Sequence, residues 1–296
     1  MSNDLPVHDL QVVEVEDHGP ARPQLLVEIP HAADSMAHFQ TVRSHLRSRL
    51  PDRLEEFFFV NTDVGTTAVA RAVAERLAER GLGTRIVRCL VPRTFVDCNR
   101  DLSVGPDVRT DDGLTPAIPG YVQAPEDRAW LGDLHRRYHR VASSAYEEIV
   151  GRGGRCINLH TYAPRTVQLG VIGNDIVTAL RRAYEPDAFE GWPLRPEVDL
   201  ITETPEGLLL GDAAWLRRVR EEYEAIGVGV EENGAYRLIP DTMGRVYAER
   251  YPGRLLCVEV RRDLLADPYD PFVEMKISGE KASRMARPLA DSLVPD

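Results

Sequence analysis

Apolar and polar residues follow two periods along the first third of the chain, and their alternation predicts strands and helices in turn. The clearest signal is TTAVARAVAERLAERGLG at 66–83, where alanine, valine and leucine recur at helical spacing and Gly81 marks the C-terminal end. Short apolar runs before and after this segment have the composition of strands. The elements predicted here are strands at 10–17, 23–31, 57–63 and 84–93, and helices at 35–56 and 66–83.

The alternation continues after residues 101–125, a segment rich in Gly, Pro and Asp that we expect to be a long, functional loop. Residues 151–162, GRGGRCINLHTY, combine a glycine turn with a short buried strand, and RLLCVEVRRDLL at 254–265 is a last apolar strand. The other predicted elements are helices at 126–150, 212–227 and 276–293, and strand or turn segments at 167–174 and 205–211.

The order of these elements predicts the fold class. Strands that alternate with helices are typical of a largely parallel sheet covered by helices on its faces. No internal repeat, low-complexity linker or heptad array interrupts the chain. We therefore expect one α/β domain over residues 1–296, with a mixed, mostly parallel sheet flanked by helices.

Composition narrows the classes of function. The 296 residues are 43% hydrophobic, which is enough for a sizeable core, and the net charge of −11 argues against a nucleic-acid surface. No apolar run reaches the ~20 residues of a membrane helix, and the N-terminus lacks the pattern of a secretory signal, so we expect a cytoplasmic protein. The four cysteines form no CxxC pair, and each lies in or beside an apolar stretch, which favours buried thiols over disulfides or a zinc–cysteine site.

Polar residues follow or interrupt four predicted strands. His31 and Asp34 come after the first, Asp63 ends the second, His160 follows the apolar run CINL, and Glu259 lies inside LLCVEV. Ligands of parallel α/β sheets bind beyond the carboxyl ends of the strands. Two neutral imidazoles and one carboxylate, with a position left open for water, are the donor set of a catalytic zinc site.

Each of these residues also has a structural explanation. A single histidine after a strand commonly packs or caps, and Asp63 stands where a helix N-cap is expected. Glu259 is harder to explain, because it is flanked by leucine and valine and a charge in such a strand needs a partner or a chemical role.

The segment PRTFVDCNRDL at 92–102 is unusually polar for a stretch that begins at a strand end. Arg100 and Asn99 together suit a carboxylate, through a bidentate guanidinium and an amide donor. Asp97 could orient a metal-bound histidine. The alternative is a salt-bridge cluster that only holds the loop.

Several short segments resemble zinc carboxypeptidases, in the same order along the chain. VDCNR resembles their D-x-N-R segment, NLHTY resembles the strand that ends in their third metal ligand, and LLCVEVRRD resembles the strand with their catalytic glutamate. Within that class, IPHAAD, NTDVGTTAVA, PRTFVDCNR and NLHTY are most similar to the N-formylglutamate amidohydrolase family. The resemblance spans roughly residues 24–265.

This resemblance implies a phosphorylase/hydrolase-like fold of the zinc carboxypeptidase type. It also gives the candidate residues roles. His31 and His160 would hold Zn²⁺, Glu259 would be the catalytic base, and Arg93 would face the developing oxyanion. The substrate-binding residues implied are Asn99, Arg100 and Tyr162, with Asp97 supporting a metal-bound histidine.

The third metal ligand departs from the carboxypeptidase pattern, which has His-x-x-Glu at the first site. Here Asp34 stands three residues after His31, one methylene shorter than a glutamate. We expect Asp34 to be the ligand, because a loop with ligands three residues apart can wrap one ion. Asp63 is the alternative.

We therefore predict a zinc-dependent amidohydrolase that cleaves the amide of a carboxylate-bearing N-acyl amino acid, with N-formylglutamate as the preferred substrate. The alternatives are a metallo-carboxypeptidase or another N-deacylase and, from other classes, a non-catalytic carboxylate-binding protein or a partner-binding domain. The predicted partner is a small anionic substrate, with neither nucleic acid nor a membrane. The oligomeric state does not follow from the sequence.

Overall fold

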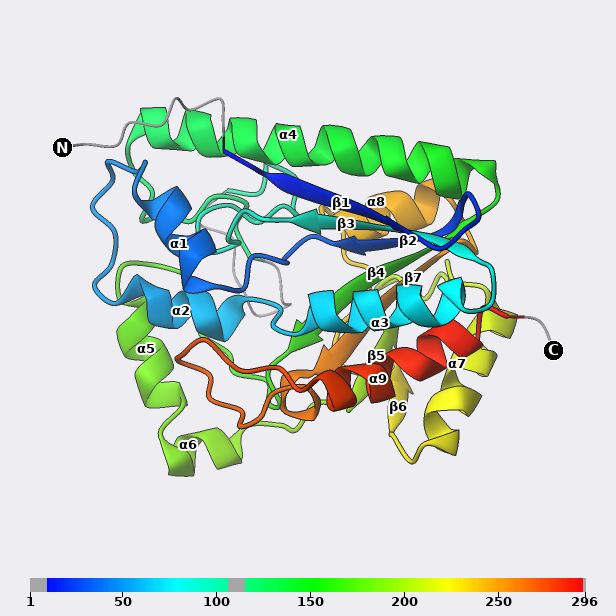
Figure 1. Cartoon of the computed structure of the whole chain (residues 1–296). Helices are drawn as coiled ribbons and strands as arrows, with labels where there is room; N and C mark the ends of the chain where they lie inside the picture. Colours follow the sequence, from blue (N-terminus) through cyan, green and yellow to red (C-terminus); the bar gives the residue numbers. More distant parts are fainter. Residues whose placement is uncertain (1–9, 106–114, 295–296) are drawn as a thin grey trace.

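A seven-stranded sheet forms the centre of the computed structural model, which describes residues 10–105 and 115–294 (Figure 1). The strand order is β1-β3-β2-β4-β7-β5-β6. The four central strands β3, β2, β4 and β7 are parallel to their neighbours, whereas β1 pairs antiparallel with β3 and β5 pairs antiparallel with β7. The strands are β1 Val13–His18, β2 Pro23–Ile29, β3 Gly83–Cys89, β4 Arg155–Tyr162, β5 Val198–Ile201, β6 Val230–Glu232 and β7 Leu255–Arg261.

Helices cover both faces of this sheet. In Figure 1 the long helix α4 runs along one face, with α8 beside it, and α3, α7 and α9 lie on the other. No helix within the described ranges has both the length and the apolar character that a membrane crossing requires. The helices are α1 Met36–Arg43, α2 Leu54–Asn61, α3 Thr66–Ala78, α4 Pro125–Ile149, α5 Ile176–Ala183, α6 Pro186–Gly191, α7 Ala213–Ala225, α8 Met243–Arg250 and α9 Gly279–Asp291, with 3₁₀ turns η1 Val150–Arg152 and η2 Arg262–Leu264.

The alternation of side chains along the central strands explains the two layers. In β2, Leu26 packs into the core beneath α4, whereas Leu25 and Val27 pack into the core beneath α3 and α9. A strand that is buried on both faces consists of a nearly continuous run of apolar residues, and this composition is why the sequence predicted the central strands. The predicted fold class, a mixed and mostly parallel sheet flanked by helices, is confirmed.

Residues 57–63, predicted as a strand, are not one. Phe57, Phe58 and Phe59 belong to helix α2 and are all buried, Phe58 completely. Aromatic residues favour strands by propensity, but three consecutive aromatics can also be buried by a helix that is enclosed on several sides. Here α2 packs against α1 and α5, so the apolar run marks burial and not an extended backbone.

Other predicted elements differ in extent. The surface helix expected at 35–56 is the shorter α1 followed by non-helical chain before α2, and 167–174 and 205–211 contain no named strand. The sequence did not indicate α5, α6, α8, β5 or β6. Of the loop expected at 101–125, residues 106–114 lie outside the described part, and the described residues before α4 contain no helix or strand.

The connection from α2 to α3 is a tight loop that the surrounding chain fixes in place. The Thr62 hydroxyl donates to the carbonyl of Ala33 at 2.6 Å, and the Thr161 hydroxyl donates to the carbonyl of Val64 at 3.0 Å. Gly65 then begins α3 with φ of +89°, a left-handed conformation in which a side chain is strained. The loop is therefore tied to the chain after β2 and to the end of β4.

Replacing Gly65 with alanine should destabilise the protein more than the same change at Gly81. Both glycines have positive φ, so each substitution should cost about 1–2 kcal/mol of backbone strain. A Cβ at Gly65 would also lie 2.9 Å from Leu265 Cδ1, whereas a Cβ at Gly81 meets nothing within 4 Å. Urea unfolding of Gly65→Ala and Gly81→Ala measures the difference, and equal losses would contradict a packing role for Gly65.

Candidate metal and catalytic site

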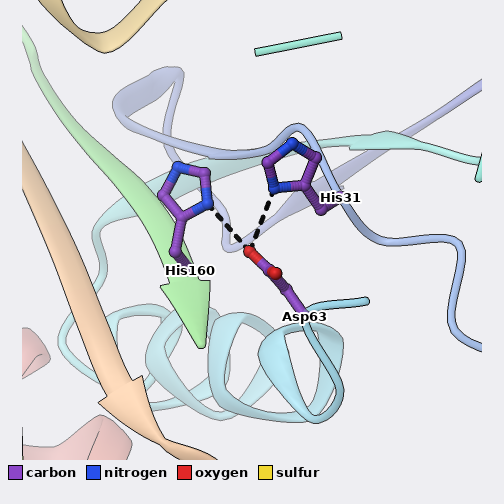
Figure 2. A group of neighbouring side chains, drawn as sticks. All are labelled: His31, Asp63 and His160. Atoms are coloured by element: carbon purple, nitrogen blue, oxygen red, sulfur yellow. Dashed lines mark hydrogen bonds and ion pairs between the residues drawn. The ribbon is translucent and has the colours of Figure 1, made fainter. Parts of the chain in front are cut away.

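Two histidines and one aspartate, far apart in sequence, meet at the carboxyl end of the central strands. Figure 2 shows the Nδ1 atoms of His31 and His160 directed at one carboxylate oxygen of Asp63. The distances to Asp63 Oδ2 are 3.1 Å from His31 and 2.8 Å from His160, and the ring centroids are 5.1 Å apart. Within the described residues this is the cluster whose ligand atoms lie close enough together to share one metal ion.

The sheet and the α2–α3 loop bring these three residues together. His31 lies in the turn after β2, and His160 lies within β4, the strand that pairs with β2. Asp63 is in the α2–α3 loop, which is anchored at Ala33 and at Thr161, one residue after His160. The backbone thus holds the aspartate against both histidines.

The outer nitrogens of both rings have fixed partners. His31 Nε2 lies 2.7 Å from Asp97 Oδ1, and His160 Nε2 lies 2.8 Å from Asn158 Oδ1. Because carboxylate and amide oxygens only accept, each Nε2 must carry the proton and donate. In a neutral imidazole the proton on Nε2 leaves a lone pair on Nδ1, which is the atom directed at Asp63.

The orientation of Asn158 is set by a buried carboxylate. The Asn158 amide nitrogen donates to Glu28 at 2.5 Å, which turns the amide oxygen toward His160. Tyr138 and Tyr146, both on α4, donate their hydroxyl groups to the same carboxylate at 2.5 and 2.9 Å. Glu28 and Asn158 are each 1% exposed, so this network lies fully inside the protein.

These contacts provide a chemical test of whether a metal fits. Two imidazole lone pairs facing one carboxylate oxygen at about hydrogen-bond distance repel it unless a cation lies between them. A divalent metal satisfies all three donors, and histidines whose other nitrogen is held by a carboxylate or an amide oxygen have the arrangement of metal ligands. The residues present therefore fit a metal ion held by His31, Asp63 and His160.

The second oxygen of Asp63 faces two arginines. Asp63 Oδ1 lies 3.5 Å from Arg93 Nη1 and 3.6 Å from Arg262 Nη2. Arg93 also donates to Asp97 at 2.8 Å, so one arginine connects both carboxylates that contact His31.

Glu259 lies opposite His160 across the pairing of β4 with β7. Directly paired residues of parallel strands project from the same face of a sheet. Burial raises the pKa of Glu259 to about 7, although the nearby His160 opposes that rise. Its Oε2 atom is buried and has no hydrogen-bond partner among the described residues.

A cavity of about 370 Å³ opens in front of these groups. Asp63, Arg93, Asp97, Glu259 and Arg262 contribute polar side chains to its lining. The remaining lining residues come mainly from α2, the chain after β4 and α5, and they include Phe57, Val60, Tyr162, Arg165, Leu169, Ile172, Ile176, Leu180, Arg195 and Tyr236. Charged, polar and apolar side chains thus share the lining of this cavity.

Comparison with known proteins identifies the family of the chain. The family model of N-formylglutamate amidohydrolases matches residues 24–266, which is most of the chain. The chain belongs to the N-formylglutamate amidohydrolase family. It is thus a member of a family of hydrolases that act on carbon–nitrogen bonds.

Two solved structures show the same fold at low sequence identity. The N-formylglutamate amidohydrolase of Ralstonia eutropha JMP134 is 17% identical, with a TM-score of 0.58 over 95% of this chain and 97% of that one. A gene product of Agrobacterium tumefaciens is 18% identical, with a TM-score of 0.52 over 96% of this chain and 97% of that one. A metallo-carboxypeptidase from Burkholderia cenocepacia is more distant, at 12% identity and a TM-score of 0.38 over 97% of this chain and 65% of that one. No significant match is found among curated proteins.

The structure corrects the expected third ligand in this family member. The ligand atoms of His31, Asp63 and His160 lie within 4.8 Å of one another, and Asp34 does not belong to this group. After the turn at His31 the chain leads into α1, and the Asp34 carboxylate lies 3.9 Å from His38 Nδ1 on that helix. The spacing argument failed because it treated 31–34 as one loop around an ion, whereas this segment is the entry to a helix.

Asn99 and Arg100, predicted to bind the substrate carboxylate, do not line the cavity. Arg100 is buried and donates from Nη1 to the carbonyl of Asn99 at 3.0 Å, and its backbone pairs with Thr242. This placement does not support the predicted role. Tyr162 does line the cavity, with its hydroxyl donating to the carbonyl of Pro196 at 2.7 Å, and Asp97 contacts His31 as expected.

Four residues of this site were missed from the sequence. Asn158 and Glu28 are polar residues inside apolar strands, the same signal that identified Glu259. Arg262 follows β7 directly and contacts Asp63, whereas Arg195 lies in an irregular segment that carries no local signal.

Replacing Asp63 with alanine should weaken zinc binding by about 10-fold or more, because it removes a donor that both histidines face. Asp34→Ala should leave the affinity near that of the parent, since its carboxylate faces His38. Zinc titration of the two variants measures this, with thermal unfolding to verify that each is folded. A larger loss at Asp34 would restore the assignment made from sequence.

Proposed function

We propose that this protein is a zinc-dependent amidohydrolase that cleaves a carboxylate-bearing N-acyl amino acid, and that N-formylglutamate is the first substrate to test. The observation that carries the proposal is the convergence of two imidazole lone pairs and the Asp63 carboxylate beside a partly buried glutamate, Glu259, at a cavity. Family membership supports the class of reaction.

Three protein donors are the usual number for a catalytic zinc ion, and histidine with carboxylate is a common set. His31, Asp63 and His160 would hold it, with Asp97 and Asn158 orienting the two rings. Zinc in such a site supplies Lewis-acid activation of water and of an amide carbonyl.

Two other residues that line the cavity would complete the catalytic machinery. Glu259, with its raised pKa of about 7, takes a proton from water at its carboxylate and passes it to the leaving amide nitrogen. Arg93 borders the cavity between Asp63 and Asp97, where its charge would stabilise negative charge on the amide oxygen. A base with a pKa near the working pH transfers protons efficiently in both directions.

The test combines metal content with turnover. Elemental analysis of the purified protein should give one zinc ion per chain, and the zinc-loaded protein should release formate from N-formylglutamate. Removal of the metal with a chelator should abolish turnover, and zinc should restore it. A protein that binds carboxylates without turnover in any metal-loaded form would instead support the non-catalytic alternative.

Glu259→Gln should retain zinc but lose about 10²–10⁴-fold in kcat, since glutamine has a similar shape and cannot accept the proton. Glu221→Gln, on the exposed face of α7, is the matched control and should keep parental turnover. Steady-state kinetics with metal analysis measures both variants. Near-parental activity of Glu259→Gln would mean that this carboxylate has only a structural role.

A further inference from the structure

We propose that Arg262 is a positioning residue of the metal site: it holds one oxygen of Asp63, so that this carboxylate presents only its other oxygen to the metal. The inference rests on the part of the proposed function that places a metal between His31, Asp63 and His160. It does not depend on the substrate or on turnover. It gives a role to a buried cation that the proposed mechanism does not use.

The Arg262 guanidinium connects three separate parts of the chain. Arg262 follows β7 directly as the first residue of η2, and it is buried, with 4% of its surface exposed. It donates from Nη1 to the carbonyl of Val60 in the last turn of α2, at 2.5 Å, and from Nη2 to the carbonyl of Thr161 in β4, at 3.0 Å. The same Nη2 lies 3.6 Å from Asp63 Oδ1. One side chain thus ties the end of α2 and the Asp63 loop to the strand that carries His160.

Asp63 is the counter-charge of this cation. In the described part of the chain it is the carboxylate that forms an ion pair with Arg262, and the two side chains are 2% and 5% exposed. A charge buried to this extent is costly unless an opposite charge lies close to it. The ion pair therefore restrains Asp63 through the oxygen that the histidines do not contact.

The two oxygens of Asp63 consequently have different surroundings. Oδ2 faces the Nδ1 atoms of both histidines at 3.1 and 2.8 Å, whereas Oδ1 faces Arg262 and Arg93. The carboxylate cannot turn to offer both oxygens to one ion without giving up its contacts with the guanidinium groups. Each of the three ligand residues then supplies one atom, which leaves positions open for water and substrate.

Arg93 contacts the same oxygen but is held in a different way. Its Nη1 lies 3.4 Å from the carbonyl of Asn61 and 3.5 Å from Asp63 Oδ1, and its Nη2 donates to Asp97 at 2.8 Å. Arg93 thus connects two carboxylates within the site. Arg262 instead connects Asp63 to backbone carbonyls of a helix and a strand, whose positions are fixed by their own hydrogen bonds. It is therefore the arginine that fixes Asp63 relative to the sheet.

A direct contact with the substrate is the competing explanation for Arg262. The residue lines the cavity, and its buried Nε–H group has no hydrogen-bond partner among the described residues. The two explanations differ in what a substitution changes. Loss of a substrate contact raises KM and leaves the metal as it was, whereas loss of a group that positions Asp63 changes how the metal is held.

Cobalt substitution tests the ligand arrangement directly, because four-coordinate Co²⁺ absorbs visible light more strongly than Co²⁺ with five or six ligands. Arg262→Lys keeps the positive charge but replaces a planar fork with a single nitrogen, which cannot hold two carbonyls and a carboxylate in the same geometry. We expect the visible absorption of bound Co²⁺ to fall severalfold in this variant, because Asp63 is free to bind with both oxygens. Zinc affinity, measured by competition with a chelator, should fall by about 10-fold or more.

Arg76→Met is the matched control for the loss of a buried ion pair. Arg76 donates two hydrogen bonds to Asp291 of α9, at 2.6 and 2.7 Å, and neither residue lines the cavity. This variant should unfold at a lower temperature than the parent and keep the parental cobalt spectrum and zinc affinity. Arg262→Met should change the spectrum as Arg262→Lys does. If the methionine variant does not fold, the lysine variant decides, because it retains the buried charge.

The outcomes separate this inference from the proposed function. If the zinc-loaded protein hydrolyses no substrate, the proposed function fails, and the cobalt spectra still decide the inference because they require no turnover. A parental spectrum in Arg262→Lys overturns the inference, since Asp63 then binds the metal in the same way without the arginine. A raised KM with a parental spectrum would assign Arg262 to the substrate. A parent protein that binds neither metal overturns the inference and the proposed function together.

Discussion

The contact of one carboxylate oxygen with two imidazoles is the interaction around which the functional end of this protein is organised. Asp63 brings His31 and His160 to within hydrogen-bond distance of the same atom, although these residues come from different elements. The contact is favourable only when positive charge lies between the donors. Asp97 and Asn158 strengthen this need for a cation. They accept hydrogen bonds from Nε2 of His31 and His160, which keeps the ring protons away from Asp63.

A buried carboxylate in the core beneath the site helps to orient one of its histidines. Glu28 is buried under α4 and is compensated by two tyrosine hydroxyls and the Asn158 amide. Such a carboxylate is costly unless all its lone pairs are used, and here its hydrogen bonds fix the direction of an amide that in turn fixes His160. The position of the His160 ring therefore depends on packing between α4 and the sheet.

Much of this could be predicted from the sequence, because continuous apolar runs identify the central strands and polar residues at their ends are conspicuous. His31, His160 and Glu259 were found in this way, and all three lie at the site. Asp34 was preferred over Asp63 because local spacing is visible in a sequence whereas the approach of a distant loop is not. For the same reason, Arg195 could not be found: its position depends on how irregular segments fold over the end of the sheet.

The pairing of His160 with Glu259 across β4 and β7 has a mechanical consequence. Adjacent strands are separated by about 4.8 Å, a spacing that hydrogen bonds set and that resists deformation. Glu259 and His160 are thus parts of a single stiff unit. Asp63 belongs to a loop between helices and can shift when those helices do. The parts of the site therefore differ in stiffness: partial loosening of the helical layer would move Asp63 away from the two imidazoles, while the spacing between Glu259 and His160 would stay the same.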